Sequence, residues 1–382
     1  MGLDIRNVAE AFPPGEFIKE ELEARGWTQE DLAEIMGRQS SIISGLVNGK
    51  RVVSPDIASD LAAAFGTTAQ LWMNLETAYQ LFVENRISEA VRRKARLFEK
   101  APVSEMIKRG WIEASKNLDV LEDRVLKFLE IDSLDQETNL SYAAKRSTPA
   151  ANPSQVAWVY RARKIARGIQ AGAFSDAAFG HAVSRLKELR SNPEDVRLVP
   201  RILAEGGVRF LLIEKLPKGK IDGVCFWLDE FSPVIAISMR YDRLDHFWYI
   251  TMHECGHVQN RDALGGQPIL DVDLVGDQAV AFDDKPEVEK RADIFAETFL
   301  VEKHEMDNFI GRFRPLYSKQ KIKNFAGRIG VHPAIVLGQL QHYKEVDWSH
   351  SREMLVKVRN ILISCALTDG WGSTVPSNMS GV

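Results

Sequence analysis

The sequence has little cysteine, no long apolar run and only a small net charge. Its three cysteines lie far apart, which is typical of reduced thiols and argues against a disulfide framework. No apolar run approaches the roughly 20 residues that a membrane span needs. Residues 1–12 show no basic flank followed by an apolar core, so they do not resemble a secretory signal. We therefore expect a cytoplasmic protein without a membrane segment.

The net charge of -4 gives no general attraction to nucleic acid, so any DNA binding must come from a local basic surface. Apolar residues make up 45% of the chain and charged residues 27%, which is typical of a folded globular protein. A chain of 382 residues exceeds the size at which one core usually suffices. Composition alone therefore predicts two or three domains.

Short helices with clear start and stop signals fill roughly the first 85 residues. A proline start and Gly26 bound the first helix, and Thr28 with Asp31 can form a reciprocal cap for the second. Glycines also follow the second, third and fourth helices, and a longer fifth helix begins near Thr68. We predict five compact helices.

Residues 28–51 have the pattern of a helix-turn-helix, with the turn at Met36-Gly37-Arg38. Small polar side chains on the second helix can reach base edges, and the basic residues beyond it can meet phosphates. A helical bundle used for protein contacts is the alternative. The predicted inner apolar positions are Ala33, Ile35, Ile42, Ile43 and Leu46. The candidate DNA-binding residues are Gln39, Ser40, Ser41, Ser44, Asn48, Lys50 and Arg51.

The pattern stays helical to about residue 200 and then changes to short β-branched and aromatic runs, which predict three strands of one antiparallel sheet. Two long helical patterns follow, at 241–258 and 286–304, separated by an irregular acidic stretch at 261–286. Strands followed by helices predict an α+β domain. The predicted strands lie within 208–216, 224–229 and 233–239.

Two histidines and a glutamate form the strongest chemical motif. His253 and His257 are four residues apart, so on a helix both imidazoles can hold one ion about 2 Å away. Glu254 lies next to that face, where it can act on a zinc-bound water as general base. With 8 histidines in the chain, the motif is expected by chance on the order of once in a hundred such sequences. The apolar run before it indicates a buried helix, in which unpartnered imidazoles would be costly.

A catalytic zinc needs a third protein ligand, and Glu289 on a second helix is the leading candidate. Asp293, one helical turn on, can accept the second ring N–H of a histidine and fix its tautomer. Glu287 and Glu297 are competing ligands, and a solvated acidic face is the alternative for any one of these carboxylates.

Three other residues near the motif have a structural and a chemical interpretation. His332, before a proline at a predicted helix start, is a candidate oxyanion donor, although such a histidine is more often a capping or packing residue. His246, seven residues before the motif, is interpreted as structural. Cys255, between the two histidines, is interpreted as core filler.

The stretches TMHECGHV, EVEKRADIFAETFL and IGVHPAIVLGQLQ together resemble the ImmA/IrrE family of bacterial and phage zinc endopeptidases, over about residues 200–345. The resemblance implies a gluzincin-like metallopeptidase with His253, His257 and Glu289 as zinc ligands and Glu254 as general base. It also implies a transcriptional repressor as substrate. This chain departs from the family pattern in its long acidic insert and in FLVEKHE at the end of the second zinc helix.

Residues from Phe12 to Asn85 resemble HigA-type antitoxins of the XRE repressor family, through TQEDLAEIMG, LVNGKR and FGTTAQLWMNLETAYQL. Ser40 and Ser41 stand where the family often has arginine and glutamine, which leaves fewer long side chains for reading bases. Such domains usually dimerise on palindromic DNA, so the resemblance implies operator DNA as a partner and a homodimer.

These features predict a multidomain chain. Residues 1–90 form an all-α helix-turn-helix domain, 91–200 an α-helical connector and 201–345 an α+β, zincin-like metallopeptidase domain. Residues 346–382 hold a helix and a disordered tail.

Three functions are compatible with this organisation. The leading hypothesis is a DNA-binding regulator whose zinc peptidase cleaves a repressor or its own chain. The alternative is a non-catalytic antitoxin or ligand-sensing repressor with a structural zinc site. A third hypothesis is a toxin–antitoxin component that neutralises a toxin partner through the connector.

Overall fold

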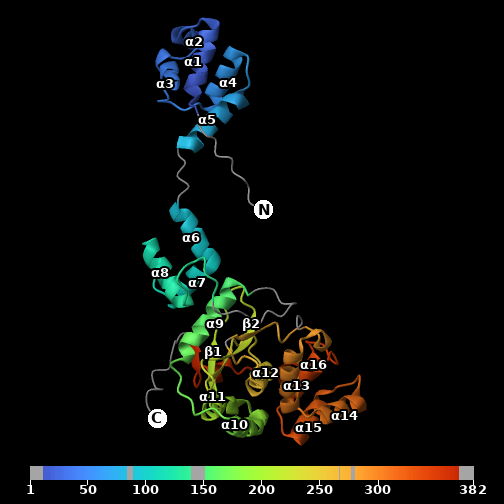
Figure 1. Ribbon diagram of the computed structural model, residues 1–382. Helices are drawn as coiled ribbons and strands as arrows, with labels where there is room; N and C mark the ends of the chain where they lie inside the picture. The colour runs from blue at the N-terminus through green and yellow to red at the C-terminus, as the bar shows by residue number, and fades with distance from the viewer. Residues whose placement is uncertain (1–11, 84–88, 139–150, 266, 277–279, 370–382) are drawn as a thin grey trace. The chain divides into compact units, whose positions relative to one another are not determined.

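The computed structural model of the protein describes residues 12–83, 89–138, 151–265, 267–276 and 280–369 (Figure 1). The chain divides into two compact units, residues 1–92 and 93–382. The predicted connector forms part of the second unit. The tail predicted to be disordered begins at Leu367, and for its first three residues the prediction is wrong, because Leu367–Asp369 form a strand that pairs with the sheet. The rest of the tail, beyond residue 369, lies outside the described residues. No helix among the described ranges is long and apolar enough to cross a membrane.

The first unit is a bundle of five helices, as the start and stop signals predict. Thr28 and Asp31 form the predicted capping box, and Gly26 ends the first helix with a φ of 65°. Thirteen residues form its buried core, among them Ile43 and Trp72. The prediction that Ile35 faces this core is wrong, since it is 50% exposed. The helices are α1 (Pro14–Arg25), α2 (Gln29–Ile35), α3 (Ser40–Val47), α4 (Pro55–Phe65) and α5 (Ala69–Val83).

The second unit is built around a five-stranded sheet in the order β4-β2-β3-β1-β5. Strand β2 runs antiparallel to β3 and β4, whereas β1 runs parallel to β3 and β5. The predicted antiparallel sheet is therefore wrong, because β1 pairs with the far strand of the β2–β3 hairpin and so lies parallel to it. The strands are β1 (Arg209–Ile213), β2 (Ile221–Trp227), β3 (Pro233–Ile237), β4 (Ile269–Val272) and β5 (Leu367–Asp369).

Helices cover both faces of this sheet, so the side chains of its central strands are apolar on both faces. Phe210 and Leu212 point into one core, and Leu211 and Ile213 point into the other. The second of these cores contains side chains from α6 (Glu89–Lys100), α7 (Val103–Lys108), α8 (Leu118–Leu129) and α9 (Pro153–Ala166). In Figure 1, α9 runs alongside β1. Helices α6 to α9 of the predicted connector are therefore one layer of the fold, whereas the last part of the connector belongs to the opposite layer.

The opposite face of the sheet carries the remaining helices. The first core contains side chains from α10 (Asp176–Glu188), α11 (Val199–Glu205), α12 (Leu244–Asn260), α13 (Glu287–Leu300), α14 (Lys303–Phe313), α15 (Lys319–Ile329), α16 (Pro333–His342) and α17 (Arg359–Leu362). Short 3₁₀ turns occupy Leu189–Ser191, Pro193–Leu198, Phe282–Asp284 and Arg352–Met354. Helix α12 packs against β2 and β3 on one side and against α13 on another.

A glycine sets the close approach of α12 and α13. A Cβ added at Gly256 would lie 2.9 Å from Cα of Ala292, closer than such atoms come in proteins. The two helices therefore touch through their backbones at this point. This contact brings the first turns of α13 beside the motif on α12.

Candidate metal centre and DNA-binding surface

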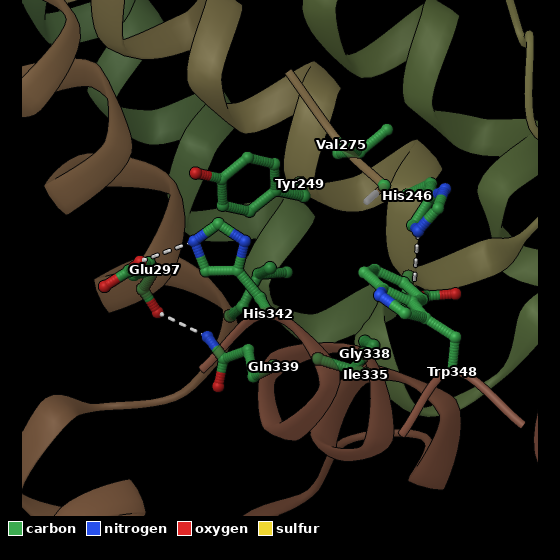
Figure 2. A pocket seen from close by; sticks show the side chains of 12 residues that line it. His246, Tyr249, Val275, Glu297, Ile335, Gly338, Gln339, His342 and Trp348 are labelled. Carbon is green, nitrogen blue, oxygen red and sulfur yellow. Dashed lines mark hydrogen bonds and ion pairs between the residues drawn. The ribbon is translucent and has the colours of Figure 1, made fainter. Parts of the chain in front are cut away.

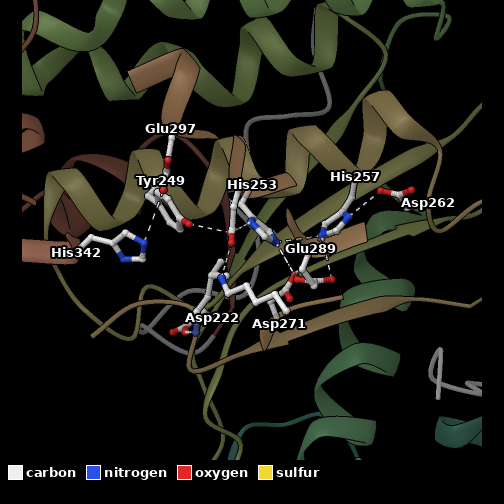
Figure 3. Close-up of polar contacts among 12 residues, drawn as sticks. Asp222, Tyr249, His253, His257, Asp262, Asp271, Glu289, Glu297 and His342 are labelled. Atoms are coloured by element: carbon white, nitrogen blue, oxygen red, sulfur yellow. Dashed lines mark hydrogen bonds and ion pairs between the residues drawn. The ribbon is translucent and has the colours of Figure 1, made fainter. Parts of the chain in front are cut away.

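Four buried side chains meet between α12, α13 and β4 (Figure 3). His253 and His257 come from α12, Glu289 from α13 and Asp271 from β4. One ligand atom from each lies within 4.8 Å of all the others. The structure thus brings together the three sequence-predicted ligands and adds Asp271, which the sequence interpretation placed in an irregular stretch.

The distances within this cluster are at the long end of the hydrogen-bond range or beyond it, and they suit an ion at its centre. The Nε2 atoms of His253 and His257 are 3.1 Å apart. His253 Nε2 lies 3.3 Å from a Glu289 oxygen and 3.5 Å from Asp271 Oδ2. His257 Nε2 lies 3.7 Å from each of these two carboxylates. Donor atoms about 2.0–2.2 Å from a tetrahedrally held ion lie about 3.3–3.6 Å apart, so the arrangement fits a divalent cation.

The charges of the cluster also favour a bound cation. Two carboxylates in a buried pocket bring two negative charges, which a divalent cation would balance. Burial would lower the pKa of His253, but the charge of Asp271 and its carboxylate hydrogen bonds raise that pKa well above the usual value. The carboxylates therefore favour positive charge within the cluster, and a divalent cation would supply it while both imidazoles stay neutral. A set of two imidazoles and two carboxylates is compatible with zinc.

Each histidine is held in place by an aspartate on its second ring nitrogen. Nδ1 of His253 lies 2.9 Å from Asp293 Oδ1, the partner predicted from the sequence. Nδ1 of His257 lies 3.0 Å from Asp262 Oδ2, a partner that the sequence did not indicate. These contacts leave both Nε2 atoms facing the cluster and favour the tautomer with a free Nε2 lone pair.

Asp293 is itself supported by two donors. The Tyr249 hydroxyl donates to its Oδ1 at 2.8 Å, and Lys285 Nζ donates to its Oδ2 at 2.6 Å. Burial alone would raise the pKa of Asp293, but the contact with His253 and the charge of Lys285 lower it to about 2. Asp293 is therefore an ionised anchor for the His253 ring.

Glu254 lies beside the cluster without a hydrogen bond. Both of its oxygens are buried and form no hydrogen bond within the described ranges. Burial raises the pKa of Glu254 well above the usual value, and the charge of Asp271 adds to this effect. The carboxylate lies against Gly223 of β2, where an added Cβ would overlap Oε1. A buried, unsatisfied carboxylate of this kind is costly and is typical of functional sites.

The competing acids lie elsewhere. Glu287 is exposed, whereas Glu297 accepts a hydrogen bond from the Tyr343 hydroxyl at 3.0 Å. His332 begins α16, where its Nδ1 accepts the backbone N–H of Ala334 at 3.1 Å. The structure thus gives this candidate oxyanion donor a capping role outside the four-residue cluster. Cys255 is buried in the core of the second unit.

A small pocket lies beside the first turns of α12 (Figure 2). Its wall includes Tyr249, the residue that donates a hydrogen bond to Asp293. Figure 2 shows His342 and Gln339 turned toward Glu297. On the other side His246 packs edge-on against Tyr241 and Trp348. Its burial supports the structural interpretation made from the sequence.

The predicted DNA-binding side chains lie around α3 of the first unit. Gln39, Ser40 and Ser41 are exposed at its start, and Ser44 is half-buried. Asn48, Lys50 and Arg51 are exposed beyond its end. Asn48 donates to the Ser44 carbonyl at 2.8 Å and so closes the helix. The structure therefore leaves a polar start and a basic end open to a partner.

Arg38 fixes the turn between α2 and α3. Its Nε donates to Asp60 at 2.6 Å and its Nη2 to Asp56 at 3.0 Å, both on α4. These ion pairs use the arginine that is nearest in sequence to the start of α3. Among the predicted DNA-binding residues, Lys50 and Arg51 are the exposed basic ones.

Comparisons with known proteins match the first unit. The helix-turn-helix family model matches residues 18–72. The antitoxin HigA-1 of Vibrio cholerae is 40% identical over 80 residues, which cover 20% of this chain and 75% of that protein. Virulence-associated protein I of Dichelobacter nodosus is 32% identical over 87 residues, which cover 22% of this chain and 81% of that protein.

Two solved structures are similar over the same share of the chain. An addiction module antidote protein of a HigA family from Coxiella burnetii is 28% identical, with coverage of 22% of this chain and 90% of that one and a TM-score of 0.20. A Pseudomonas aeruginosa protein solved in complex with its operator DNA is 31% identical, with coverage of 19% and 81% and a TM-score of 0.19.

Proposed function

Through its N-terminal unit the chain belongs to the helix-turn-helix family that includes the antitoxin HigA-1, and from this premise we propose that it is a DNA-binding transcriptional regulator carrying a zinc-dependent endopeptidase. The peptidase belongs to the second unit and resembles the ImmA/IrrE family. Its substrate is a repressor protein or a second copy of this chain. The regulator binds operator DNA as a homodimer.

One observation carries the peptidase proposal: Glu254 is buried beside the four-residue cluster with neither oxygen hydrogen-bonded. A purely structural metal site needs no such carboxylate, and burying it without a partner costs stability. A general base needs an oxygen that is free to accept a proton and a pKa above that of an exposed glutamate. Glu254 has two oxygens without a hydrogen bond among the described residues, and its burial raises its pKa.

The residues of this chain divide the chemical work as follows. A bound zinc ion would polarise a peptide carbonyl and lower the pKa of a water molecule. His253, His257 and Glu289 would hold the ion, and the two imidazole rings are oriented by Asp293 and Asp262. Glu254 accepts the proton of the attacking water at a carboxylate oxygen and passes it to the leaving amine.

The peptidase proposal is tested with Glu254→Gln. Full-length wild type and variant, each loaded with zinc, are incubated with a peptide library prepared from a bacterial proteome, and new termini are identified by mass spectrometry. We expect about one zinc per chain in both proteins, and cleavage at least a hundredfold slower with the variant. Equal cleavage by the two proteins, at a rate above that of the zinc-free chain, would exclude Glu254 as the base.

The DNA-binding proposal is tested with Lys50→Ala and Arg51→Ala. An operator is first selected from random duplexes with the full chain, and affinity is then measured against salt concentration. Each variant should weaken binding and reduce the salt slope by about one. Lys127→Ala is the control, since that lysine is exposed on α8 of the second unit. Unchanged salt slopes in the first two variants would show that Lys50 and Arg51 do not contact the phosphates.

A second candidate function is a non-catalytic antitoxin or ligand-sensing repressor with a structural metal site. The fourth buried ligand, Asp271, favours it, because structural zinc sites have four protein ligands and catalytic ones keep an open position. In this case zinc removal would unfold the second unit and no library peptide would be cut.

A further inference from the structure

We propose that Asp271 is a displaceable fourth metal ligand that closes the centre, so that the free chain is a latent peptidase until β4 moves. This proposal rests on the proposed function, since latency has meaning only for an enzyme. It also explains how a centre with a general base can carry a full set of protein ligands.

The first argument is the position of the Asp271 carboxylate. Its Oδ2 lies 3.5 Å from His253 Nε2 and 3.7 Å from His257 Nε2, the separations expected of neighbouring ligands in a tetrahedron. Oδ2 is buried and forms no hydrogen bond among the described residues. With Glu289 completing the set, this oxygen lies where an open site would place a water or a substrate carbonyl.

The second argument is how β4 presents this side chain. The register between β2 and β4 shifts between Ile221 and Gly223, directly opposite Asp271. A shift of this kind re-aims a side chain and is common next to active sites. Asp271 pairs with Gly223, and a Cβ at Gly223 would meet the Glu254 carboxylate, so Asp271 and Glu254 lie on the same face of the sheet.

The third argument is that Asp271 is held less firmly than the other three ligands. His253, His257 and Glu289 belong to long helices that touch through their backbones, whereas Asp271 belongs to a four-residue strand at the edge of the sheet. Within the described residues, β4 pairs with β2 alone.

Polar contacts hold the end of β4 together with the buried side chains of Leu274 and Val275. Asp222 accepts the Leu274 N–H at 2.7 Å, and Arg240 donates to Asp273 at 2.7 Å. Water or a competing strand can replace such contacts more readily than it can separate a pair of packed helices. An event at this edge would therefore release Asp271 and leave the other three ligands in place.

The test measures access to the metal and does not depend on a substrate. The full-length chain is loaded with Co²⁺ in place of zinc, and its visible absorption is recorded while acetohydroxamate, a small bidentate metal ligand, is added. We expect the wild-type spectrum to stay unchanged. Asp271→Ala and Asp271→Asn should bind acetohydroxamate at least tenfold more tightly and show the spectral shift of a changed coordination number. Using two variants guards against a folding defect in one of them.

The control is Asp284→Asn, which removes an exposed carboxylate from the same insert without touching the cluster. It should match wild type. A wild-type spectrum that shifts as readily as those of the Asp271 variants would show that Asp271 does not close the metal centre. Loss of the metal from both Asp271 variants, with helix content retained, would show that Asp271 is a required ligand and not a displaceable one.

Failure of the proposed function is seen separately in the peptide-library assay. If the centre opens to acetohydroxamate in the Asp271 variants and none of these proteins cuts the library, the peptidase proposal fails while the fourth-ligand assignment stands. Cleavage at least tenfold faster in the Asp271 variants than in wild type supports both.

Discussion

At the scale of single residues, Gly223 decides where the Glu254 carboxylate can lie. A Cβ at this position would overlap Glu254 Oε1 and come within 2.9 Å of its Cδ. Glycine is otherwise unfavourable in a strand interior, because it costs conformational entropy and packs nothing. Its presence here is explained by the space that the buried carboxylate needs.

We predict that Gly223→Ala retains zinc and loses cleavage by at least a hundredfold, because Glu254 is displaced while the metal ligands are not. Relief of the overlap should lower the free energy of unfolding by about 1–3 kcal/mol. Zinc content, library cleavage and urea unfolding measure the three effects. Gly180→Ala is the control, since nothing lies within 4 Å of its Cβ and alanine favours a helix. A fully active Gly223→Ala would show that the Glu254 position is unimportant.

His246 gives a prediction about pH. Burial lowers the pKa of His246 to about 4, from 6.5 in an exposed histidine, although Asp245 opposes the shift. Between these values the unfolded chain binds a proton that the folded chain does not, so stability is full above pH 6.5 and falls toward pH 4. Wild type should lose about 2–3 kcal/mol more than His246→Phe between pH 7.5 and pH 4.5.

Urea unfolding of both proteins at the two pH values measures this difference. Phenylalanine keeps the edge-on ring packing against Tyr241 and Trp348 but cannot titrate. If the two proteins lost the same stability on acidification, the histidine would have to be accessible to solvent in the folded chain.

The sequence predicted three of the four cluster residues and missed the fourth for a physical reason. His253 and His257 are neighbours on one helix, so their spacing alone places them together. Asp293 was predicted as their support because it lies one turn beyond Glu289. Asp271 comes from a strand that meets the helices only in three dimensions, so no spacing relates it to the other ligands.

At the scale of elements, the contact between α12 and α13 sets the geometry of the centre. Gly256 allows the backbones to touch at Ala292, one turn after Glu289. We predict that Gly256→Ala weakens zinc binding at least tenfold, because a Cβ forces α13 and its glutamate away from the histidines. The magnitude follows from the cost of losing good ligand geometry.

Competition with a chromophoric zinc chelator measures this affinity. Gly327→Ala on α15 serves as the matched control, because its Cβ would contact nothing within 4 Å. If the Gly256 variant bound zinc as tightly as wild type, the close helix contact would have no role in building the centre.

Elements were predictable where their signals are local. Caps and glycine stops mark the helices of the first unit, so their order followed from the sequence. The strand β4 was missed because it has four residues and lies in an acidic stretch, although Ile269, Asp271 and Val272 belong to a partly alternating run. The parallel pairing of β1 with β3 depends on contacts distant in sequence, which a run of apolar residues does not specify.

At the scale of the whole molecule, no hydrophobic core of the described residues is shared by the two units: the first unit has one core and the second has one on each face of its sheet. The core of the first unit is made by α1–α5, whereas the four metal-cluster residues lie in the second unit. Because separate cores can unfold separately, the metal should influence only one of them. This separation is expected of a chain that combines DNA binding with a second activity.

We predict two thermal transitions, of which a chelator lowers only one. A metal that binds the folded state at a thousand times its Kd contributes about 4 kcal/mol, which corresponds to about 10 °C in a unit of this size. Calorimetry of the full chain with zinc and with EDTA measures the shift, and His257→Ala should reproduce the EDTA result. The other transition should stay unchanged and should rise when the selected operator is added. A chelator that lowered both transitions equally would show that the two units unfold as one.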